Sequence, residues 1–138
     1  MKALSGRQPW WWAIMNAGKR IENRRWNTNY RGPVLLHAAK GCTRAEYIEA
    51  LNWMIEADVL GCAVCPRLED LQRGGIVGRA RIVDVIPPGT QSPFNRPPGI
   101  DMRWHMPEQY GFVLEDVEPL PFRECKGALG LFEAPEGL

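Results

Sequence analysis

Hydrophobic residues recur at helical spacing in two segments of the chain. After Thr43 the apolar positions repeat every three or four residues, and a capping box runs from Thr43 to Glu46, so we predict an amphipathic helix over residues 44–58. A shorter helix opens with the tryptophans at positions 10–12, because Pro9 suits the first helical turn. Three consecutive tryptophans cover most of the circumference of a helix, so at least one ring is expected near the surface or in a groove.

Runs of β-branched and apolar residues predict strands elsewhere, at residues 34–38, 76–86, 110–115 and 128–132. Residues 19–26 look extended and precede turn residues, which predicts a hairpin-like pair with residues 34–38. A short helical segment is expected over residues 67–73. The uneven interleaving of these elements predicts an α+β fold, with a small mixed β-barrel of five to six strands and two to three flanking helices.

Length and composition restrict the class of protein. A chain of 138 residues is expected to form a single domain over residues 1–138. With 45% hydrophobic and 24% charged residues, a disordered chain and a fibrous rod are both excluded. The longest uncharged apolar stretch, residues 9–17, is about half of the roughly 20 residues that would span a bilayer. We therefore expect a soluble, cytoplasmic protein with no membrane partner.

Charge is small in sum but uneven along the chain. Residues 1–45 carry nine Lys or Arg and one acidic residue, Glu22, while residues 46–138 carry eight Lys or Arg and fifteen Asp or Glu. The first part is therefore +8 and the second −7, which gives the net charge of +1. This asymmetry indicates either a basic face that meets an anionic ligand or two faces that neutralise each other inside the fold.

Four cysteines raise the question of a metal site. Only Cys62 and Cys65 have ligand spacing, and His37 and His105 do not supply the second pair that a structural zinc site requires. We therefore expect no metal site and no cofactor.

The densest group of charged residues lies in the extended segment 19–26. Because side chains alternate along a strand, Arg20, Glu22 and Arg24 should share one face, and the two arginines would hold the carboxylate ionised. Lys19 can join that face only if it stands in the turn before the strand. The alternative interpretation is a solvated edge strand whose cations prevent aggregation.

Several short motifs follow one another in an order and spacing that resemble the ASCH domain (activating signal cointegrator homology), a branch of the PUA-like superfamily. The resemblance covers practically the whole chain. It rests on Ser5-x-x-Gln8-Pro9-Trp10, Lys19-x-x-Glu22-x-Arg24 with Trp26, Arg31-Gly32, His37-Ala38-Ala39-Lys40, Gly75-Ile76-Val77-Gly78, Val83-Asp84-Val85, Tyr110-Gly111-Phe112-Val113 and Lys126-Gly127-Ala128-Leu129-Gly130-Leu131-Phe132.

This resemblance implies a small PUA-like barrel that binds RNA or another single-stranded nucleic acid, or a modified nucleoside, in a basic cleft beside the Lys19-x-x-Glu22-x-Arg24 segment. Grouped cations would neutralise phosphates and an exposed ring would stack on a base. The implied ligand-binding residues are Gln8, Trp10, Arg24, Trp26, Arg31, His37 and Lys40. Trp26 and His37 also have a second interpretation, as core residues.

An enzyme of the same fold is the main alternative. Lys19 and Glu22 would then be the catalytic residues of an amidohydrolase that acts on N4-acylated cytidine, or Lys19 and Arg24 would stabilise the transition state of a ribonuclease. A protein-interaction module that uses the tryptophan surface is a third hypothesis. The proline-rich loop over residues 88–108, which contains His105, would be a lid if it covers the cleft.

Overall fold

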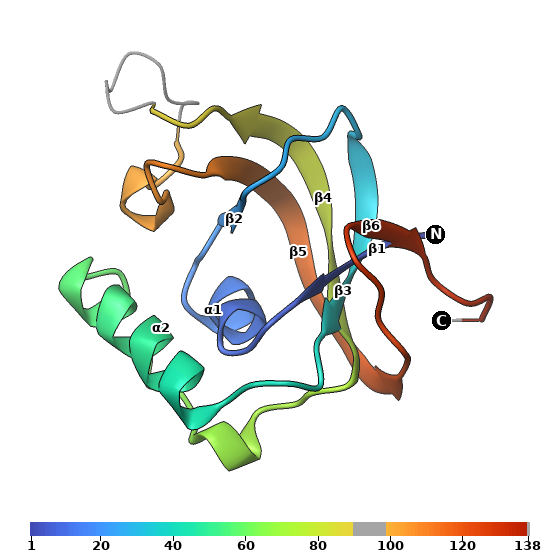
Figure 1. The fold of residues 1–138 in the computed structure, drawn as a ribbon, viewed down its shortest axis with the longest axis horizontal. Coiled ribbons are helices and arrows are strands. Elements are labelled where there is room, and N and C mark those ends of the chain that lie inside the picture. The colour runs from blue at the N-terminus through green and yellow to red at the C-terminus, as the bar shows by residue number, and fades with distance from the viewer. Residues whose placement is uncertain (90–98, 138) are drawn as a thin grey trace.

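The computed structural model describes residues 1–89 and 99–137 and has an α+β fold, in which one curled sheet forms a half-barrel (Figure 1). The helices are α1 (Trp10–Asn16), α2 (Arg44–Glu56) and the short 3₁₀ turns η1 (Leu68–Asp70) and η3 (Met102–Trp104). The strands are β1 (Lys2–Gly6), β2 (Ile21–Arg24), β3 (Gly32–Ala38), β4 (Gly75–Ile86), β5 (Tyr110–Glu124) and β6 (Leu131–Glu133). The predicted fold class and the predicted mixed barrel are confirmed.

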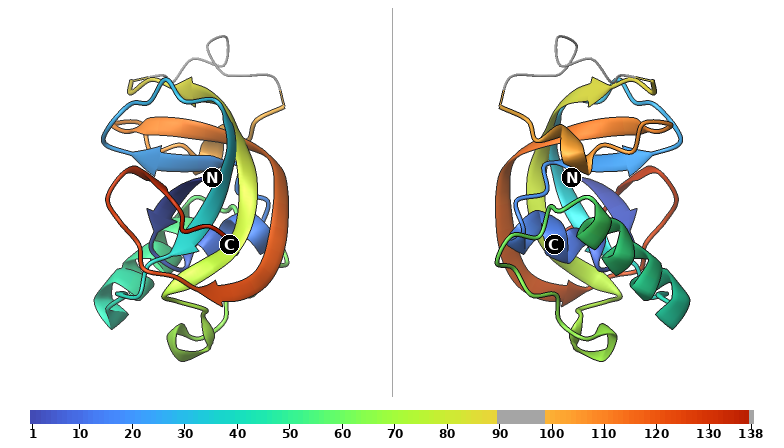
Figure 2. Two further views of the ribbon diagram at one scale, coloured as in Figure 1. Left: turned by 90° about the vertical axis from the view of Figure 1, so that its right-hand side faces the viewer. Right: turned by 90° about the vertical axis from the view of Figure 1, so that its left-hand side faces the viewer.

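The sheet is mixed because one of its strand pairs is parallel. Its order is β2-β5-β4-β3-β1-β6, in which β1 pairs with β3 in parallel and the other neighbours are antiparallel. The long β4–β5 pair contains three register shifts, and irregularities of this kind bend and twist a sheet. Figure 2 shows these two strands curving around the molecule, so that the sheet becomes a trough that holds α1.

The predicted hairpin between residues 19–26 and 34–38 is wrong. β2 pairs with β5 instead, with Ile21 opposite Val113. β3 is buried at nearly every position, which is typical of a central strand, and it lies between β4 and β1 in the sheet. The four-residue strand β2 can occupy the outer edge of the sheet.

Other predicted elements differ from the structure mainly at their ends. The predicted helix over residues 44–58 is confirmed as α2, with its complete capping box. The segment 67–73 contains only the η1 turn. β5 continues far beyond residue 115, because its outer half pairs with β4 although it carries Pro119, Pro121 and exposed charges that are typical of a loop.

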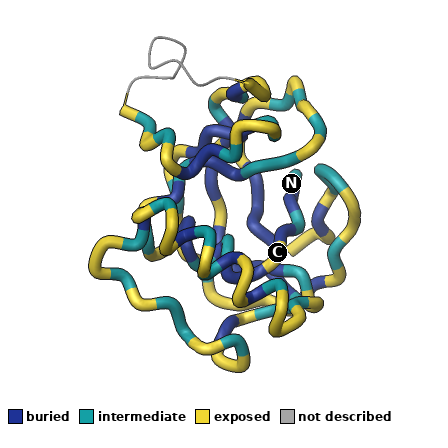
Figure 3. The backbone as a smooth tube through the Cα atoms, turned by 60° about the vertical axis from the view of Figure 1, so that its left-hand side comes forward, coloured by how far each residue is buried: buried dark blue, intermediate teal, exposed yellow. Residues whose placement is uncertain are grey.

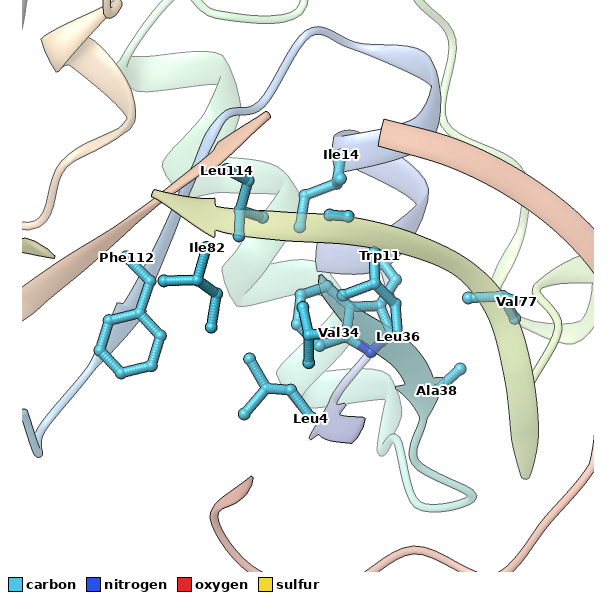
Figure 4. Close-up of a cluster of buried hydrophobic side chains, with 11 residues drawn as sticks. Leu4, Trp11, Ile14, Val34, Leu36, Ala38, Val77, Ile82, Phe112 and Leu114 are labelled. Atoms are coloured by element: carbon cyan, nitrogen blue, oxygen red, sulfur yellow. The ribbon is translucent and has the colours of Figure 1, made fainter. Parts of the chain in front are cut away.

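The trough of the sheet contains the main apolar core, and α1 fills it. Trp11 of this helix is fully buried, and its indole Nε1 donates a hydrogen bond of 2.6 Å to the carbonyl of His37. Figure 3 shows the buried segments of the backbone gathered in the interior of the molecule. Figure 4 shows side chains from α1 and the strands meeting there, among them Leu4, Trp11, Ile14, Val34, Leu36, Ala38, Val77, Ile82, Phe112 and Leu114.

The described part of the 88–108 loop packs against the body of the molecule. Trp104 in η3 is buried in a second apolar cluster with Met54 and Ile86, and His105 is also buried. Residues 90–98 of this loop lie outside the described residues. No helix in the described part of the chain combines the length and the apolar character needed to cross a bilayer.

Close packing of β1 against Trp11 yields a testable consequence. A Cβ on Gly6 would lie 2.6 Å from Trp11 Cε2, whereas a Cβ on Gly41 would meet no atom within 4 Å. Gly6→Ala is therefore expected to lower the free energy of unfolding by about 1–3 kcal/mol through overpacking, as measured by urea denaturation. Gly41→Ala is the control and should remain near wild type. Equal stability of the two variants would show that the contact is not restrictive.

Candidate functional site

A pocket of about 320 Å³ opens between α2, the start of α1 and β2. Its floor consists of Lys19 and Glu22, and we call it the Lys19–Glu22 pocket. Its lining residues are Arg7, Gln8, Trp10, Lys19, Glu22, Asn23, Glu46, Glu49, Ala50, Trp53, Met106 and Gln109. Four of the residues predicted from the sequence therefore face one cavity, namely Lys19, Glu22, Gln8 and Trp10.

Lys19 reaches Glu22 because it stands in the turn between α1 and β2. Gly18 has a φ of 74°, a left-handed conformation that ends the helix and turns the chain. The Lys19 ammonium then lies 2.7 Å from Glu22 Oε1, and the side chains of Lys19 and Glu22 are only 1% and 8% exposed. The sequence indicates that Lys19 can share the face of Glu22 only if it stands in the turn before the strand. The structure places Lys19 in that turn.

Glu22 has a second cationic partner in Arg24. The Arg24 Nη2 group donates to Glu22 Oε2 at 3.0 Å, so both carboxylate oxygens accept charge-assisted bonds. The sequence also predicts Arg20 on this face, and that is wrong. Arg20 donates to the backbone carbonyls of Ile14 and Lys19 instead, and these bonds stabilise the turn between α1 and β2.

Arg24 also ties the two sides of the trough together. Its Nη2 donates to the carbonyl of Ser5 at 2.8 Å, although β2 and β1 are separated in the sheet order by β5, β4 and β3. This contact is possible only because the sheet curls. The Arg24 guanidinium lies 5.9 Å from the ring centroid of Trp11. Arg24 Nε is a buried donor with no acceptor among the described residues.

Burial and pairing act in opposite directions on these charges. Desolvation is the largest influence on Glu22 and disfavours its ionised form, but Lys19 and Arg24 together outweigh it and hold the pKa of Glu22 below its ordinary value. Desolvation lowers the pKa of Lys19, and Glu22 opposes this shift. The pair is therefore an ionised carboxylate against an ammonium whose proton is less firmly held than in water.

Aromatic rings form the walls above this pair. Trp10 and Trp53 meet edge to face, with ring centroids 5.7 Å apart, and Trp53 also packs on the buried Trp104. The Lys19 ammonium lies 5.4 Å from the Trp10 ring centroid. Of its three N–H donors, one reaches Glu22 and the structure gives no other protein acceptor among the described residues. The floor can therefore donate hydrogen bonds to a ligand that lies in the pocket against these rings.

The rim of the pocket is not basic. Arg7 forms an ion pair with Glu46, which also closes the capping box of α2, and Glu49 stands beside it. Counting charged lining residues, two cations (Arg7, Lys19) oppose three carboxylates (Glu22, Glu46, Glu49), a formal sum of −1. The cleft is thus mixed in charge, whereas the sequence predicts a basic one.

Two polar lining residues already serve the fold. Gln8 donates through Nε2 to the Gln72 carbonyl and accepts from the Trp12 amide, so it holds the first turn of α1. Asn23 donates to the Trp104 carbonyl and accepts from the Met106 amide, so it anchors the loop after η3. Both side chains shape the pocket by fixing its walls.

The other predicted ligand-binding residues lie elsewhere. Arg31 is exposed, and its guanidinium donates to nearby backbone carbonyls. Trp26 packs against Phe112 at 5.2 Å between ring centroids, on the main core. His37 and Lys40 line a different cavity, beside the end of β1. The structure therefore divides the predicted site residues between two cavities and three other positions, because Arg24 lines neither cavity.

The sequence did not identify the wall that α2 contributes. Glu46, Glu49, Ala50 and Trp53 follow the i, i+3, i+4, i+7 spacing that places residues on one helix face, so their common face was available as a signal. Nothing local indicated that this face would stand opposite Trp10. Within the described residues, no group of three or more His, Cys, Asp or Glu side chains is arranged to hold a metal ion.

Removing the charge of Glu22 is expected to weaken the fold. Glu22→Gln should lower the free energy of unfolding at pH 7 by about 3–5 kcal/mol, because it leaves Lys19 buried without its carboxylate. Since the folded-state pKa of Glu22 lies below its ordinary value of 4.5, this stabilisation is present above that pH and is lost as the pH falls through the folded-state value. Chemical denaturation from pH 7 to pH 3 measures both effects.

Glu118→Gln is the control, since Glu118 forms an ion pair with Arg79 in which both side chains are about half exposed. Removing such a surface pair should cost only about 0–1 kcal/mol. A Glu22→Gln variant with the stability and acid response of the control would contradict the assignment of a coupled buried pair.

Comparison with known proteins agrees with this architecture. A model of the family described as ASCH domain matches residues 4–121, which is most of the chain. A search of curated proteins found no match. The matched residues include both sides of the Lys19–Glu22 pocket, from β1 through α2 to the outer part of β5. The chain therefore belongs to the ASCH domain family.

Proposed function

We propose that this protein binds RNA by taking one unstacked base, or the base of a free modified nucleoside, into the Lys19–Glu22 pocket. The observation that carries the proposal is a buried ammonium–carboxylate pair at the floor of a cavity walled by Trp10 and Trp53. The family is generally linked to RNA binding, which supports the choice of ligand class.

The dimensions of the pocket suit a single base. Its volume of about 320 Å³ is at the small end of ligand sites, which typically measure ~300–1,000 Å³. Single-stranded RNA presents bases that can be splayed out and stacked on aromatic side chains. Trp10 and Trp53 meet edge to face, so a flat ligand can stack on one ring while it contacts the edge of the other.

The charge of the lining favours a base over a phosphate. A phosphate would enter a cavity whose formal charge is already −1, and like charges in a partly desolvated site repel. A base is neutral and offers hydrogen-bonding edges. Lys19 can donate to a base carbonyl oxygen, and Glu22 can accept from a neighbouring N–H. Phosphates would then remain outside the pocket, in solvent.

Base stacking in the pocket can be tested with Trp53→Leu. We expect single-stranded RNA oligonucleotides and free nucleosides to bind the wild-type protein, and Trp53→Leu to weaken that binding about 5- to 150-fold, since stacking contributes ~1–3 kcal/mol per base. Isothermal titration measures the dissociation constants. Trp12→Leu is the matched control, because Trp12 lies on the same helix as Trp10 but lines another cavity.

Salt dependence distinguishes base capture from binding in a basic cleft. Phosphate contacts by Arg24, Arg31 and Lys40 would give a slope of log K against log salt near −2, at about −0.7 per neutralised phosphate of a single strand. Base capture in the Lys19–Glu22 pocket predicts a much shallower slope. A steep slope, or no binding at low salt, would contradict the proposal.

Hydrolysis at the same site is a second candidate, favoured by one observation. Burial lowers the pKa of Lys19, so its neutral amine, the form that can accept a proton, is reached more readily than that of a surface lysine. The carboxylate beside it is less suited to act as a base, because both of its oxygens already accept bonds from cations.

The hydrolase candidate predicts turnover that depends on the pair. Incubation with N4-acetylcytidine and with end-labelled RNA, followed by chromatography and gel analysis, should show deacylation or cleavage by the wild-type protein. Lys19→Ala/Glu22→Ala should reduce that turnover at least about 100-fold, the usual contribution of a positioned acid or base. Binding without turnover would leave base capture as the function of the pocket.

A further inference from the structure

A second cavity, of about 660 Å³, lies where β1 and β3 end beside the chain that leaves β5. Its lining residues are Ser5, His37, Ala39, Lys40, Gly74, Glu124, Cys125, Lys126, Gly127, Ala128 and Leu129. Ser5 and His37 stand opposite each other in the parallel β1–β3 register. We call this space the Ser5–His37 cavity, and it is distinct from the Lys19–Glu22 pocket.

Ser5 and His37 are joined by a hydrogen bond of defined direction. His37 Nε2 lies 2.6 Å from the backbone carbonyl of Cys125, which can only accept, so Nε2 carries the proton. In the uncharged ring Nδ1 is then an acceptor, and it lies 2.9 Å from Ser5 Oγ. The Ser5 hydroxyl therefore donates to His37. A hydroxyl, an unprotonated ring nitrogen and a group that orients the ring form the arrangement of an activated nucleophile.

The surroundings hold this pair in place and leave room beside it. Arg24 donates to the Ser5 carbonyl at 2.8 Å, which fixes the backbone of the serine. The His37 residue is almost fully buried, whereas Ser5 is partly exposed and lines the cavity, so Ser5 is the more accessible member of the pair. Gly127 lies close to both, since a Cβ there would be 2.8 Å from His37 Nδ1 and 3.0 Å from Ser5 Oγ. Because glycine occupies this position, no side chain covers the hydroxyl from there.

We propose that Ser5 is a nucleophile activated by His37, and that the Ser5–His37 cavity hydrolyses carboxylic esters. Ser5 Oγ attacks the acyl carbon while its proton passes to His37 Nδ1. The bond from that carbon to the alcohol oxygen then breaks, and the leaving alcohol takes the proton back from His37. Water next attacks the acyl-serine through the same base, which releases a carboxylic acid and restores the Ser5 hydroxyl.

The charges of the lining indicate which esters would bind. Lys40 and Lys126 oppose Glu124, a formal sum of +1, so the cavity favours an ester that carries an anionic group. Its volume is large enough for a ligand of nucleotide size. The lysine side chains can also offset the negative charge that develops on the carbonyl oxygen. This activity uses neither Lys19 nor Glu22, so failure of the base-capture proposal would not affect it, and the reverse also holds.

A fluorophosphonate probe tests the nucleophile directly, because it reacts covalently with activated serine hydroxyls. We expect the wild-type protein to be labelled at Ser5, as located by peptide mass spectrometry. The sequence contains one other serine, Ser92. Ser92→Ala should therefore keep the label and Ser5→Ala should lose it. Hydrolysis of p-nitrophenyl acetate by the same proteins should follow the same order.

The role of His37 is tested with His37→Gln, whose amide can accept from Ser5 and donate to Cys125 but is not a base. Labelling at Ser5 should fall at least about 100-fold while the far-ultraviolet circular dichroism remains native. A folded His37→Gln protein that is labelled at the wild-type rate would overturn the proposal. Should that variant fail to fold, the wild-type reaction still decides: an unlabelled Ser5, or a label on Ser92 alone, contradicts an activated nucleophile.

Discussion

The buried contact between Lys19, Glu22 and Arg24 is the constraint on which the rest of the site depends. Removing charges from water costs several kcal/mol per ion, and this cost is offset only if each charge has a close partner of opposite sign. Glu22 provides one oxygen to each cation. An apolar cluster would fill the same space with equal or better stability. The burial of these three charges, two of them at the floor of a cavity, therefore supports the proposed ligand binding.

Arg24 extends this constraint to the other side of the sheet. Through the Ser5 carbonyl it links the pair in the Lys19–Glu22 pocket to the end of β1, and Ser5 is in turn bonded to His37. The curl of the β4–β5 pair is what brings β2 and β1 close enough for this bridge. The two cavities are thus held by one connected set of hydrogen bonds. A change at Arg24 would disturb both.

Part of the uneven charge of the chain is used in ion pairs at the protein surface. Cations from the first third form ion pairs with carboxylates from later segments, as in Arg7 with Glu46 and Lys2 with Glu133. These pairs neutralise charge between the two parts of the chain, but their side chains are partly exposed and do not lie inside the fold. The resulting pocket has a mixed lining, which is why a neutral base suits it better than a phosphate.

The sequence by itself determined those features that depend on residues close together in the chain. The capping box and the helical spacing determined α2, and the order of short motifs indicated the family. Lys19 and Glu22 are three positions apart, just after the turn at Gly18, and this short separation allowed their side chains to meet. Only the tertiary structure decided that β2 pairs with β5, that α2 brings Trp53 opposite Trp10, and that His37 meets Ser5 away from the Lys19–Glu22 pocket. These contacts join segments far apart in the chain, and the curvature of the whole sheet, which no short motif encodes, sets their distances.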